Sequence, residues 1–306
     1  MKMHALAAAA AMMVAALTNP TAALAQTKIN VGYTAAGDVT PVFLAKEKGF
    51  FDKRGLDVTL TRVALASTIP AALLSNSLQI GTGTGAGLLQ AVDGGLDLVA
   101  VSGASRQLKS NSTMSLLARK EAKIAAPGDL KGKKIGVPGL NSVIDVVLRK
   151  WLKERGVAVE AVTLIEAPFP QMNDMLRGGS IDAVAVLEPF RSKIIADGNG
   201  EKVADYFTDV KDGMIFGFWI STRAWAEANA AAVRSFREAS LEGVAYIKDH
   251  PEEAKEIEAK YLGVKFPGFS SFDIEIKPAD LADYASIGKD LGLLRTSIDV
   301  TRLIAK

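Results

Sequence analysis

The stretch that decides the fold runs from residue 129 to residue 190, where apolar segments alternate with turn residues and amphipathic segments. It begins Asp-Leu-Lys-Gly-Lys-Lys-Ile-Gly-Val-Pro (129–138), continues through Glu-Ala-Pro-Phe-Pro-Gln-Met (166–172) and ends Ser-Ile-Asp-Ala-Val-Ala-Val-Leu-Glu-Pro-Phe (180–190). We interpret it as strand, helix, strand, helix and strand, the order typical of a parallel α/β lobe. The ends of such strands meet at one crevice, where α/β proteins bind small molecules.

The flanking residues extend this pattern to a second α/β lobe. Apolar segments at 113–118 and 214–221 are predicted to cross between the lobes, and amphipathic helices follow them. We therefore predict an α/β protein with two βα lobes joined by two crossing strands. The predicted parts are a first lobe at 26–118, a second lobe at 119–213, and a return strand with C-terminal helices packing on the first lobe at 214–306.

Residues 1–25 have the pattern of a secretory signal peptide. Lys2 supplies the positive charge, the 13 residues at 5–17 are apolar, and Ala23-Leu24-Ala25 form a small-residue cleavage site. A membrane-spanning helix needs about 20 apolar residues, so the run favours export over anchoring. Cleavage after Ala25 leaves 306 − 25 = 281 residues, and we expect them to form a periplasmic protein.

Composition narrows the class of function. The chain has no cysteine, which excludes disulfides and thiolate metal sites. Its 36 basic and 34 acidic residues are scattered, whereas nucleic-acid binding calls for clustered basic residues. His250 is the only histidine after the signal, and no Ser-His-Asp or Gly-Lys-Ser pattern is visible. We therefore expect a protein that is not an enzyme and that uses no cofactor, metal or nucleic acid.

A predicted helix start provides the first candidate binding residues. Ser142-Val143-Ile144-Asp145 fits the Ser-x-x-acid capping pattern before an apolar helical face. Free N–H groups and the positive end of the helix dipole suit an anionic ligand group, so Asn141 and Ser142 are candidates. The equal alternative is that Ser142 only caps the helix.

A glycine-rich loop at 81–87 provides the second set. Glycines let the backbone approach a ligand closely, and threonine hydroxyls can form hydrogen bonds with it. Thr82, Gly83 and Thr84 are therefore candidate ligand-binding residues. The loop also satisfies G-x-G-x-x-A, but the strand at 96–102 ends without the acidic residue that holds a ribose. Nucleotide binding is therefore disfavoured.

Two acidic residues can face each other across the crevice and hold an amine. Asp38 lies in the loop before the first helix, and Glu188 follows a strand of the second lobe. Glu188-Pro189 also suits a helix start, and we favour that structural role for Glu188. Thr40 belongs to the same loop as Asp38 and already suits the cap of the first helix, so capping does not explain Asp38.

Aromatic and basic residues near strand ends complete the candidates. Some of five aromatic residues can cover a ligand, although burial in the core is the more frequent role of such side chains: Tyr33, Phe190, Phe216, Phe218 and Trp219. Ser105 and Arg106 follow a first-lobe strand. Arg106 can pair in bidentate fashion with a carboxylate or sulfonate, and a solvated arginine is the equal alternative.

The chain after the signal resembles the periplasmic solute-binding proteins of ABC importers for sulfonates, taurine and nitrate, whose relatives bind thiamine-pyrimidine precursors. The matching segments, in order, are Val-Gly-Tyr (31–33), Pro-Val-Phe-Leu-Ala (41–45), Lys-Gly-Phe-Phe (48–51), Gly-Leu-Asp-Val (55–58), residues 129–137, Asp-Ala (182–183) and Glu-Pro-Phe (188–190). The resemblance implies a type II periplasmic binding protein fold that closes on its ligand.

The resemblance also implies a ligand class and partners. We expect a monomer that captures a small organic anion, such as a sulfonate or a taurine-like compound, and delivers it to an ABC permease with its ATPase. The alternatives are a pyrimidine or thiamine precursor, an aromatic acid, a sensor role, or a pyrimidine-synthase-like enzyme. The absence of cysteine argues against that enzyme, because the related synthases depend on a cysteine-rich segment and a histidine.

Overall fold

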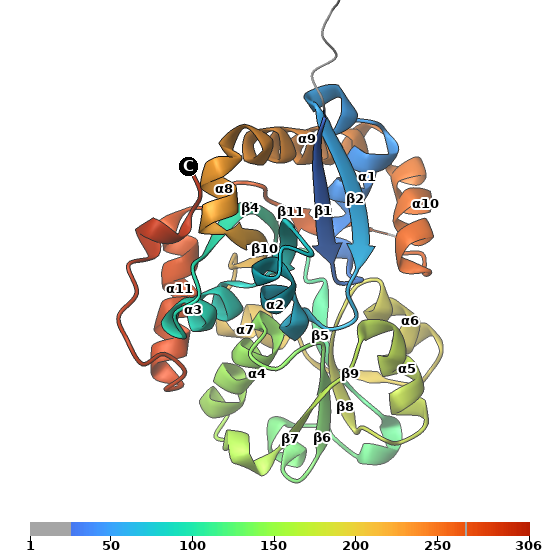
Figure 1. The fold of residues 1–306 in the computed structure, drawn as a ribbon. Coiled ribbons are helices and arrows are strands. Elements are labelled where there is room, and N and C mark those ends of the chain that lie inside the picture. Colours follow the sequence, from blue (N-terminus) through green and yellow to red (C-terminus); the bar gives the residue numbers. More distant parts are fainter. Residues whose placement is uncertain (1–25, 267) are drawn as a thin grey trace, which may run out of the picture.

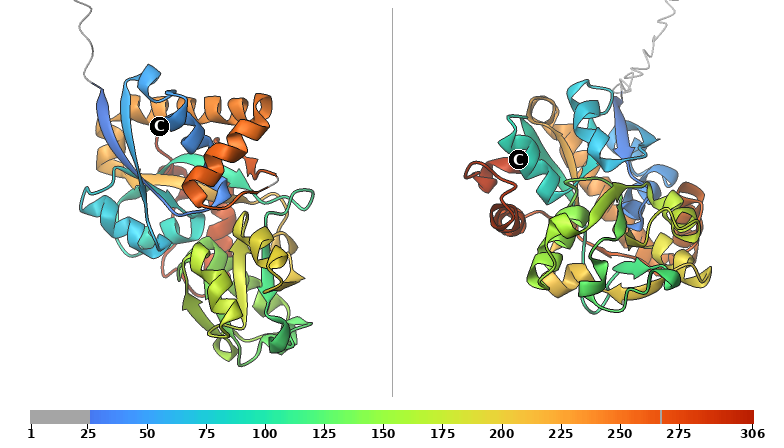
Figure 2. Two further views of the ribbon diagram at one scale, coloured as in Figure 1. Left: turned by 90° about the vertical axis from the view of Figure 1, so that its right-hand side faces the viewer. Right: turned by 90° about the horizontal axis from the view of Figure 1, so that it is seen from below.

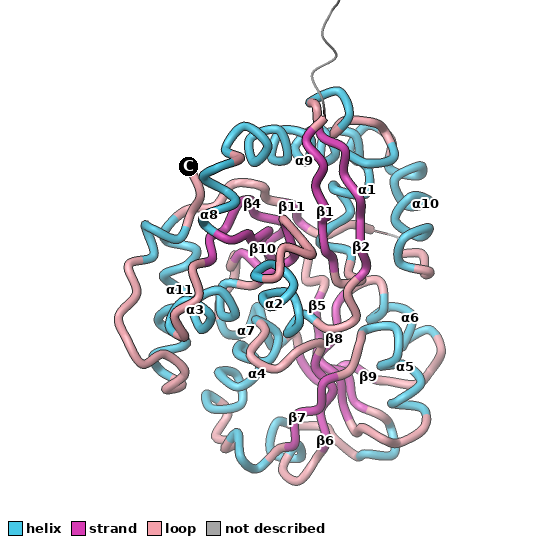
Figure 3. Tube along the Cα trace, in the orientation of Figure 1, coloured by secondary structure: helices cyan, strands magenta, loops and turns pink. Residues whose placement is uncertain are grey.

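The computed structural model describes residues 26–266 and 268–306, which form two α/β lobes (Figure 1). The predicted signal peptide lies outside the described residues. One lobe holds a six-stranded sheet of order β11-β4-β10-β3-β1-β2, and the other a five-stranded sheet of order β7-β6-β8-β5-β9. Figure 3 shows the strands at the centre of each lobe with helices outside them. The prediction of a two-lobed α/β protein is confirmed.

The first lobe is built around parallel strands β1, β2 and β3, with β10 and β11 antiparallel to their neighbours. Prolines start its first two helices, where a missing N–H costs nothing. Its strands are β1 (Thr27–Tyr33), β2 (Leu56–Arg62), β3 (Ile80–Gly83), β4 (Leu98–Arg106), β10 (Ile215–Thr222) and β11 (Ser271–Phe272). Its helices before the crossing are α1 (Thr40–Glu47), α2 (Ile69–Leu74) and α3 (Gly85–Asp93).

The second lobe contains the stretch that decided the predicted fold. Its strands are β5 (Met114–Ala118), β6 (Lys134–Val137), β7 (Thr163–Glu166), β8 (Ala183–Leu187) and β9 (Glu201–Ala204). Its helices are α4 (Val143–Glu154), α5 (Phe169–Arg177), α6 (Phe190–Ala196) and α7 (Tyr206–Val210). Strand β6 pairs in parallel with β7 and β8, as the βαβ pattern requires.

The crossing between the lobes differs from the prediction at one point. We expected residues 113–118 to end the first lobe, but β5 pairs with β8 and β9 inside the second sheet. The chain therefore crosses before Met114. The two crossing segments bond to each other there: the Gln107 N–H donates to the Met214 carbonyl at 3.0 Å, and the Gly213 N–H donates to the Gln107 carbonyl at 2.9 Å. This paired segment is the structural candidate for a hinge.

The C-terminal helices also differ from the prediction, because one of them contacts both lobes. They are α8 (Arg223–Ala228), α9 (Ala230–Asp249), α10 (Pro251–Leu262) and α11 (Pro278–Asp290). Helices α9 and α10 pack on α1, as expected, whereas α11 packs on α3 and also on α4 of the second lobe. Lys150 and Lys153 of α4 bond to Asp290 at 2.8 and 2.9 Å. Figure 2 shows how these helices wrap the first lobe.

None of the helices within the described residues is long and apolar enough to cross a membrane. The longest, α9, is amphipathic: Val233 and Phe236 on its inner face are fully buried against the first lobe, while charged side chains occupy the other face.

Candidate functional site

Two adjoining pockets lie between the lobes, at the ends of β1 and β3 and the start of α4. The inner pocket has a volume of about 40 Å³, and the outer pocket about 370 Å³. They share the lining residues Ala66, Thr82, Gly83, Thr84 and Ser142. The inner pocket also contacts Thr34, Ala36, Asp38, Pro138, Val143, Ile144, Phe169, Phe216 and Gly217. The outer pocket also contacts Ser67, Pro70, Gly87, Leu88, Gln90, Ala91, Leu140, Asn141 and Ile220.

Thr84 joins the two lobes at the boundary of the pockets. Its hydroxyl oxygen accepts a hydrogen bond from the Gly87 N–H at 3.1 Å, which caps α3. The same oxygen accepts from the Val143 N–H at 3.2 Å, at the first residue of α4 in the other lobe. One hydroxyl therefore both starts a first-lobe helix and holds the second lobe against it.

The start of α4 is already hydrogen-bonded within the protein. The Asn141 N–H donates to Asp145 Oδ2 at 2.7 Å, the Ser142 N–H to the Gly139 carbonyl at 3.3 Å, and the Val143 N–H to Thr84. Asn141 has φ of 62°, in the left-handed region that asparagine tolerates. The predicted anion cradle thus lines the outer pocket, but three of its N–H groups have partners in this conformation.

Asp38 contributes the only ionisable side chain among the residues that line the two pockets. Its side chain is buried, at 6% exposure. Burial raises the pKa of Asp38 to about 7, because the charged form loses its hydration. The hypothesis that Asp38 binds an amine is therefore consistent with a buried carboxyl group on the inner pocket.

Glu188 lies outside both pockets and has the structural role that we favoured. Its carboxylate accepts hydrogen bonds from Arg191 Nε at 2.5 Å and from the Ser192 N–H at 3.0 Å, at the start of α6. The Glu188 carbonyl accepts from the Gly37 N–H of the first lobe at 3.1 Å. Glu188 therefore helps to join the lobes, and the proposed pairing of its carboxylate with a ligand is not supported.

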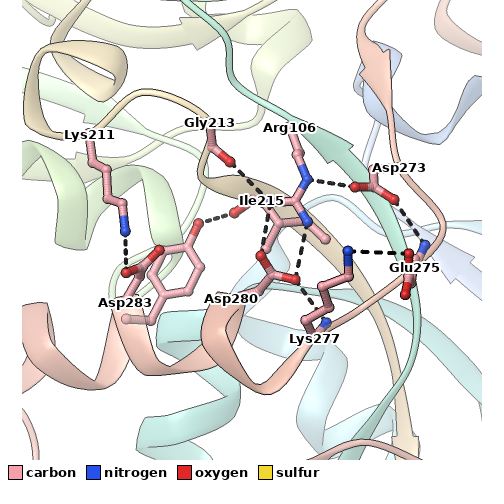
Figure 4. Close-up of polar contacts among 10 residues, drawn as sticks. Arg106, Lys211, Gly213, Ile215, Asp273, Glu275, Lys277, Asp280 and Asp283 are labelled. Carbon is pink, nitrogen blue, oxygen red and sulfur yellow. Dashed lines mark hydrogen bonds and ion pairs between the residues drawn. The ribbon is translucent and has the colours of Figure 1, made fainter.

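Arg106 also lies away from the pockets, in an ion-pair network beside the hinge (Figure 4). Its guanidinium donates to Asp273 at 2.5 Å, to both Asp280 oxygens at 2.8 and 3.2 Å, and to the Gly213 carbonyl at 3.0 Å. Because its donors are used by residues far along the chain, Arg106 anchors the C-terminal segment and is not available for a ligand carboxylate or sulfonate. This corrects its predicted role.

Five other predicted residues are packed elsewhere. Tyr33 stacks edge-on with Phe43 at 4.9 Å, and Thr40 donates to Glu258 at 2.6 Å. Ser105 is buried in β4 next to β11, and Phe218 is buried against Tyr284. Phe190 stacks on Phe169 with ring centroids 6.0 Å apart and does not line either pocket. Thus Asp38, Thr82, Gly83, Thr84, Asn141 and Ser142 are the predicted residues that line the pockets.

The prediction missed Phe169, one of the two aromatic side chains that line the inner pocket. Phe169 begins α5 after a two-residue loop that follows β7, so its position near the carboxyl end of a strand was the available signal. Phe216 and Phe218 would share one face of a regular strand, but register shifts in the pairing of β10 with β4 lie between them. The bulge gives them different surroundings, and only Phe216 contacts the pocket.

No three His, Cys, Asp or Glu side chains gather to form a possible metal site within residues 26–266 and 268–306. His250, at the start of α10, packs on Tyr246 with ring centroids 4.3 Å apart. It is not among the residues that line the pockets.

Comparison with known proteins identifies the family. The family model described as NMT1/THI5-like matches residues 36–254. A Brucella abortus protein, provisionally described as a binding protein, is 31% identical over 262 residues, covering 83% of this chain and 78% of that protein. The nitrate/nitrite binding protein NrtA of Nostoc is 25% identical over 191 residues, 55% of this chain. The match spans only 42% of the length of that NrtA.

Solved structures show the same fold at low identity. The alkanesulfonate-binding protein SsuA of Xanthomonas axonopodis, bound to MOPS, has a TM-score of 0.76 at 19% identity, covering 91% of this chain and 98% of that one. The SsuA of Escherichia coli has a TM-score of 0.72 at 20% identity, covering 91% and 97%. The desulfurization enzyme DSZB has a TM-score of 0.65 at 15% identity, covering 92% and 96%.

The fold is therefore that of the type II periplasmic binding proteins, as predicted, and it is shared by binding proteins and by an enzyme. The family match covers most of the chain, and the protein belongs to the NMT1/THI5-like family. The predicted resemblance to sulfonate- and nitrate-binding proteins is confirmed at the level of family and fold.

Proposed function

We propose that this protein is the periplasmic solute-binding component of an ABC importer, which captures a small molecule between its lobes and delivers it to a membrane permease. The observation that carries the proposal is the pair of pockets between the lobes. Hydroxyl and backbone groups from both lobes line them. A ligand that contacts both lobes stabilises the closed arrangement relative to the open one.

The side chains in the pockets favour binding over catalysis. Asp38 is their only ionisable group, and they include neither His, Cys, Lys nor Arg. General acid–base or nucleophilic chemistry normally needs a second group within hydrogen-bond reach of the first. The enzyme DSZB shares the fold, but a shared fold does not carry a shared activity.

A binding screen is needed to identify the class of ligand that this protein captures. Our expectation of a small organic anion came from the family resemblance, with the α4 start and Arg106 as the groups to hold it. The bonds of these groups within the protein weaken that expectation. A pyrimidine or thiamine precursor and an aromatic acid remain alternatives. Purified protein beginning at Gln26 should be screened by thermal shift against sulfonates, taurine, nitrate, aromatic acids, amines and pyrimidines. A ligand at 100 times its Kd adds about 2.7 kcal/mol to the free energy of unfolding.

Closure and delivery need their own measurements. Small-angle X-ray scattering with saturating ligand should show a smaller radius of gyration, and an unchanged radius would argue against closure about the hinge. Cell fractionation with N-terminal sequencing should find the protein in the periplasm beginning at Gln26, as a monomer by light scattering. Loss of ligand uptake on deletion of a neighbouring permease would support import, whereas unaffected uptake would favour a sensor.

A further inference from the structure

The inner pocket contains a carboxylate without a positive partner. Asp38 is 94% buried, since its exposure is 6%, and it lines the inner pocket together with Phe216 and Gly217. Within the described residues, only its own backbone N–H bonds to the carboxylate. A Cβ atom at Gly217 would lie 2.6 Å from Asp38 Oδ2, so this glycine makes room for the side chain. The protein thus buries a carboxyl group at the pocket and gives it no positive partner.

The charged groups around Asp38 do not supply that partner. Helix α10 contributes Glu258, which accepts from Thr40 at 2.6 Å and whose pKa is raised to about 7 by burial and by the charges of Glu188 and Asp38. The start of α6 contributes Glu188 with Arg191, which bond to each other. In α4, Asp145 is paired with Arg149 at 2.7 Å. The surroundings of Asp38 therefore contain an excess of acid.

The adjacent strand β10 adds no charge, and the one charged residue of β4, Arg106, already bonds to Asp273, Asp280 and the Gly213 carbonyl. Residues 215–222 of β10 and residues 98–105 of β4 are apolar, glycine or hydroxyl residues throughout. A buried carboxylate in such surroundings is costly unless it is paired or protonated. A buried carboxyl group without a positive partner at this position is explained if the partner arrives with the ligand.

We propose that the ligand carries a cationic amine or amidine group, which enters the inner pocket and pairs with Asp38 while the rest of the molecule occupies the outer pocket. This inference rests on the proposed solute-binding function and names a different head group from the expected organic anion. The volumes agree with this division: about 40 Å³ holds a group little larger than a water molecule, and about 370 Å³ holds the body. Phe169 and Phe216 offer aromatic surface beside the head group.

The pH dependence of binding distinguishes a cation from other head groups. A cation pairs with ionised Asp38, so protons compete with it, and its affinity should fall by about tenfold per pH unit below the pKa of Asp38 near 7. A carboxylate, sulfonate or carbonyl group would accept a hydrogen bond from protonated Asp38. Its affinity should instead rise as the pH falls below 7.

The experiment uses matched probes on the protein that begins at Gln26. Each of the benzyl, cyclohexylmethyl and butyl skeletons is tested as the amine, the alcohol and the sulfonate, by thermal shift and then by calorimetry at pH 5.5, 7 and 8.5. The variant Asp38→Asn keeps the shape and removes the charge. The control is Glu258→Gln, which removes a nearby buried carboxyl that does not line either pocket. Gly217→Ala tests the site differently, because its methyl group displaces the Asp38 carboxylate.

We expect amines to bind most tightly, more so at pH 8.5 than at pH 5.5, and Asp38→Asn to weaken them by about 10- to 100-fold at pH 8.5. Glu258→Gln should keep the preference for amines and the direction of its pH dependence. If sulfonates or alcohols bind instead, and Asp38→Asn leaves them unchanged, the inference of a cation is refuted while solute binding stands. If no compound of any charge binds here or in the wider screen, both proposals fail.

Discussion

Replacement of Thr84 by valine tests whether one hydroxyl holds the lobes together. Valine keeps the shape of threonine and removes the oxygen that accepts from Gly87 and from Val143. Loss of a helix N-cap costs about 1 kcal/mol, and loss of one hydrogen bond about 0.5–1.5 kcal/mol. The free energy of unfolding should therefore fall by about 1.5–2.5 kcal/mol. Without ligand, the equilibrium between closed and open forms should shift about 2- to 12-fold toward the open form.

The chain offers a matched control for the cap alone. Thr222 caps α8 through the Trp225 N–H at 3.2 Å and contacts no helix start in the second lobe. Urea denaturation should show a loss of about 1 kcal/mol for Thr222→Val. Energy transfer between dyes on the two lobes should be unchanged by Thr222→Val and lowered by Thr84→Val, and Thr84→Ser should restore it. Equal dye separation in all three variants would refute the role of Thr84 in closure.

Three further predictions concern stability. Because burial raises the pKa of Asp38 to about 7 from an ordinary value near 4, its contribution to stability is present below pH 4 and is lost as the pH rises to 7. The gain in the free energy of unfolding of Asp38→Asn over the parent, measured by urea denaturation, should therefore grow from pH 4 to pH 8, up to about 4 kcal/mol. A gain independent of pH would contradict the assignment. Replacement of Arg106 by methionine leaves Asp280 buried without its partner. Urea denaturation should show a fall of about 2–3 kcal/mol in the free energy of unfolding, and the affinity for the ligand should stay unchanged. A loss of affinity at unchanged stability would show that Arg106 takes part in ligand binding. A Cβ atom at Gly243 of α9 would lie 2.2 Å from the Pro41 carbonyl oxygen, whereas one at Gly128 would meet nothing within 4 Å. Calorimetric melting should therefore show that Gly243→Ala lowers the free energy of unfolding by more than about 1 kcal/mol and that Gly128→Ala leaves it nearly unchanged.

Local patterns in the sequence determined the fold class and part of the site. The alternation of apolar segments with capped amphipathic helices predicted the βαβ order of the second lobe, because period and caps are properties of neighbouring residues. The Gly-Thr loop and the start of α4 were predicted to bind a ligand because both follow parallel strands, and ligands bind at the ends of such strands. Thr82, Thr84 and Ser142 were predicted in this way, and the structure places them on the pockets.

The tertiary structure alone decided which charged and aromatic groups meet. Arg106 follows a strand, as a binding arginine would, but it is paired with Asp273 and Asp280, which lie 167 and 174 residues further along the chain. Phe216 reaches the pocket and Phe218 does not, because bulges in β10 depend on its partner strand. Asp38 is unpaired because α10 and β10, both distant in sequence, bring an acid and uncharged residues around it. Short-range patterns fix where strands end, whereas the charge and shape of a site depend on the partners that folding brings from elsewhere in the chain.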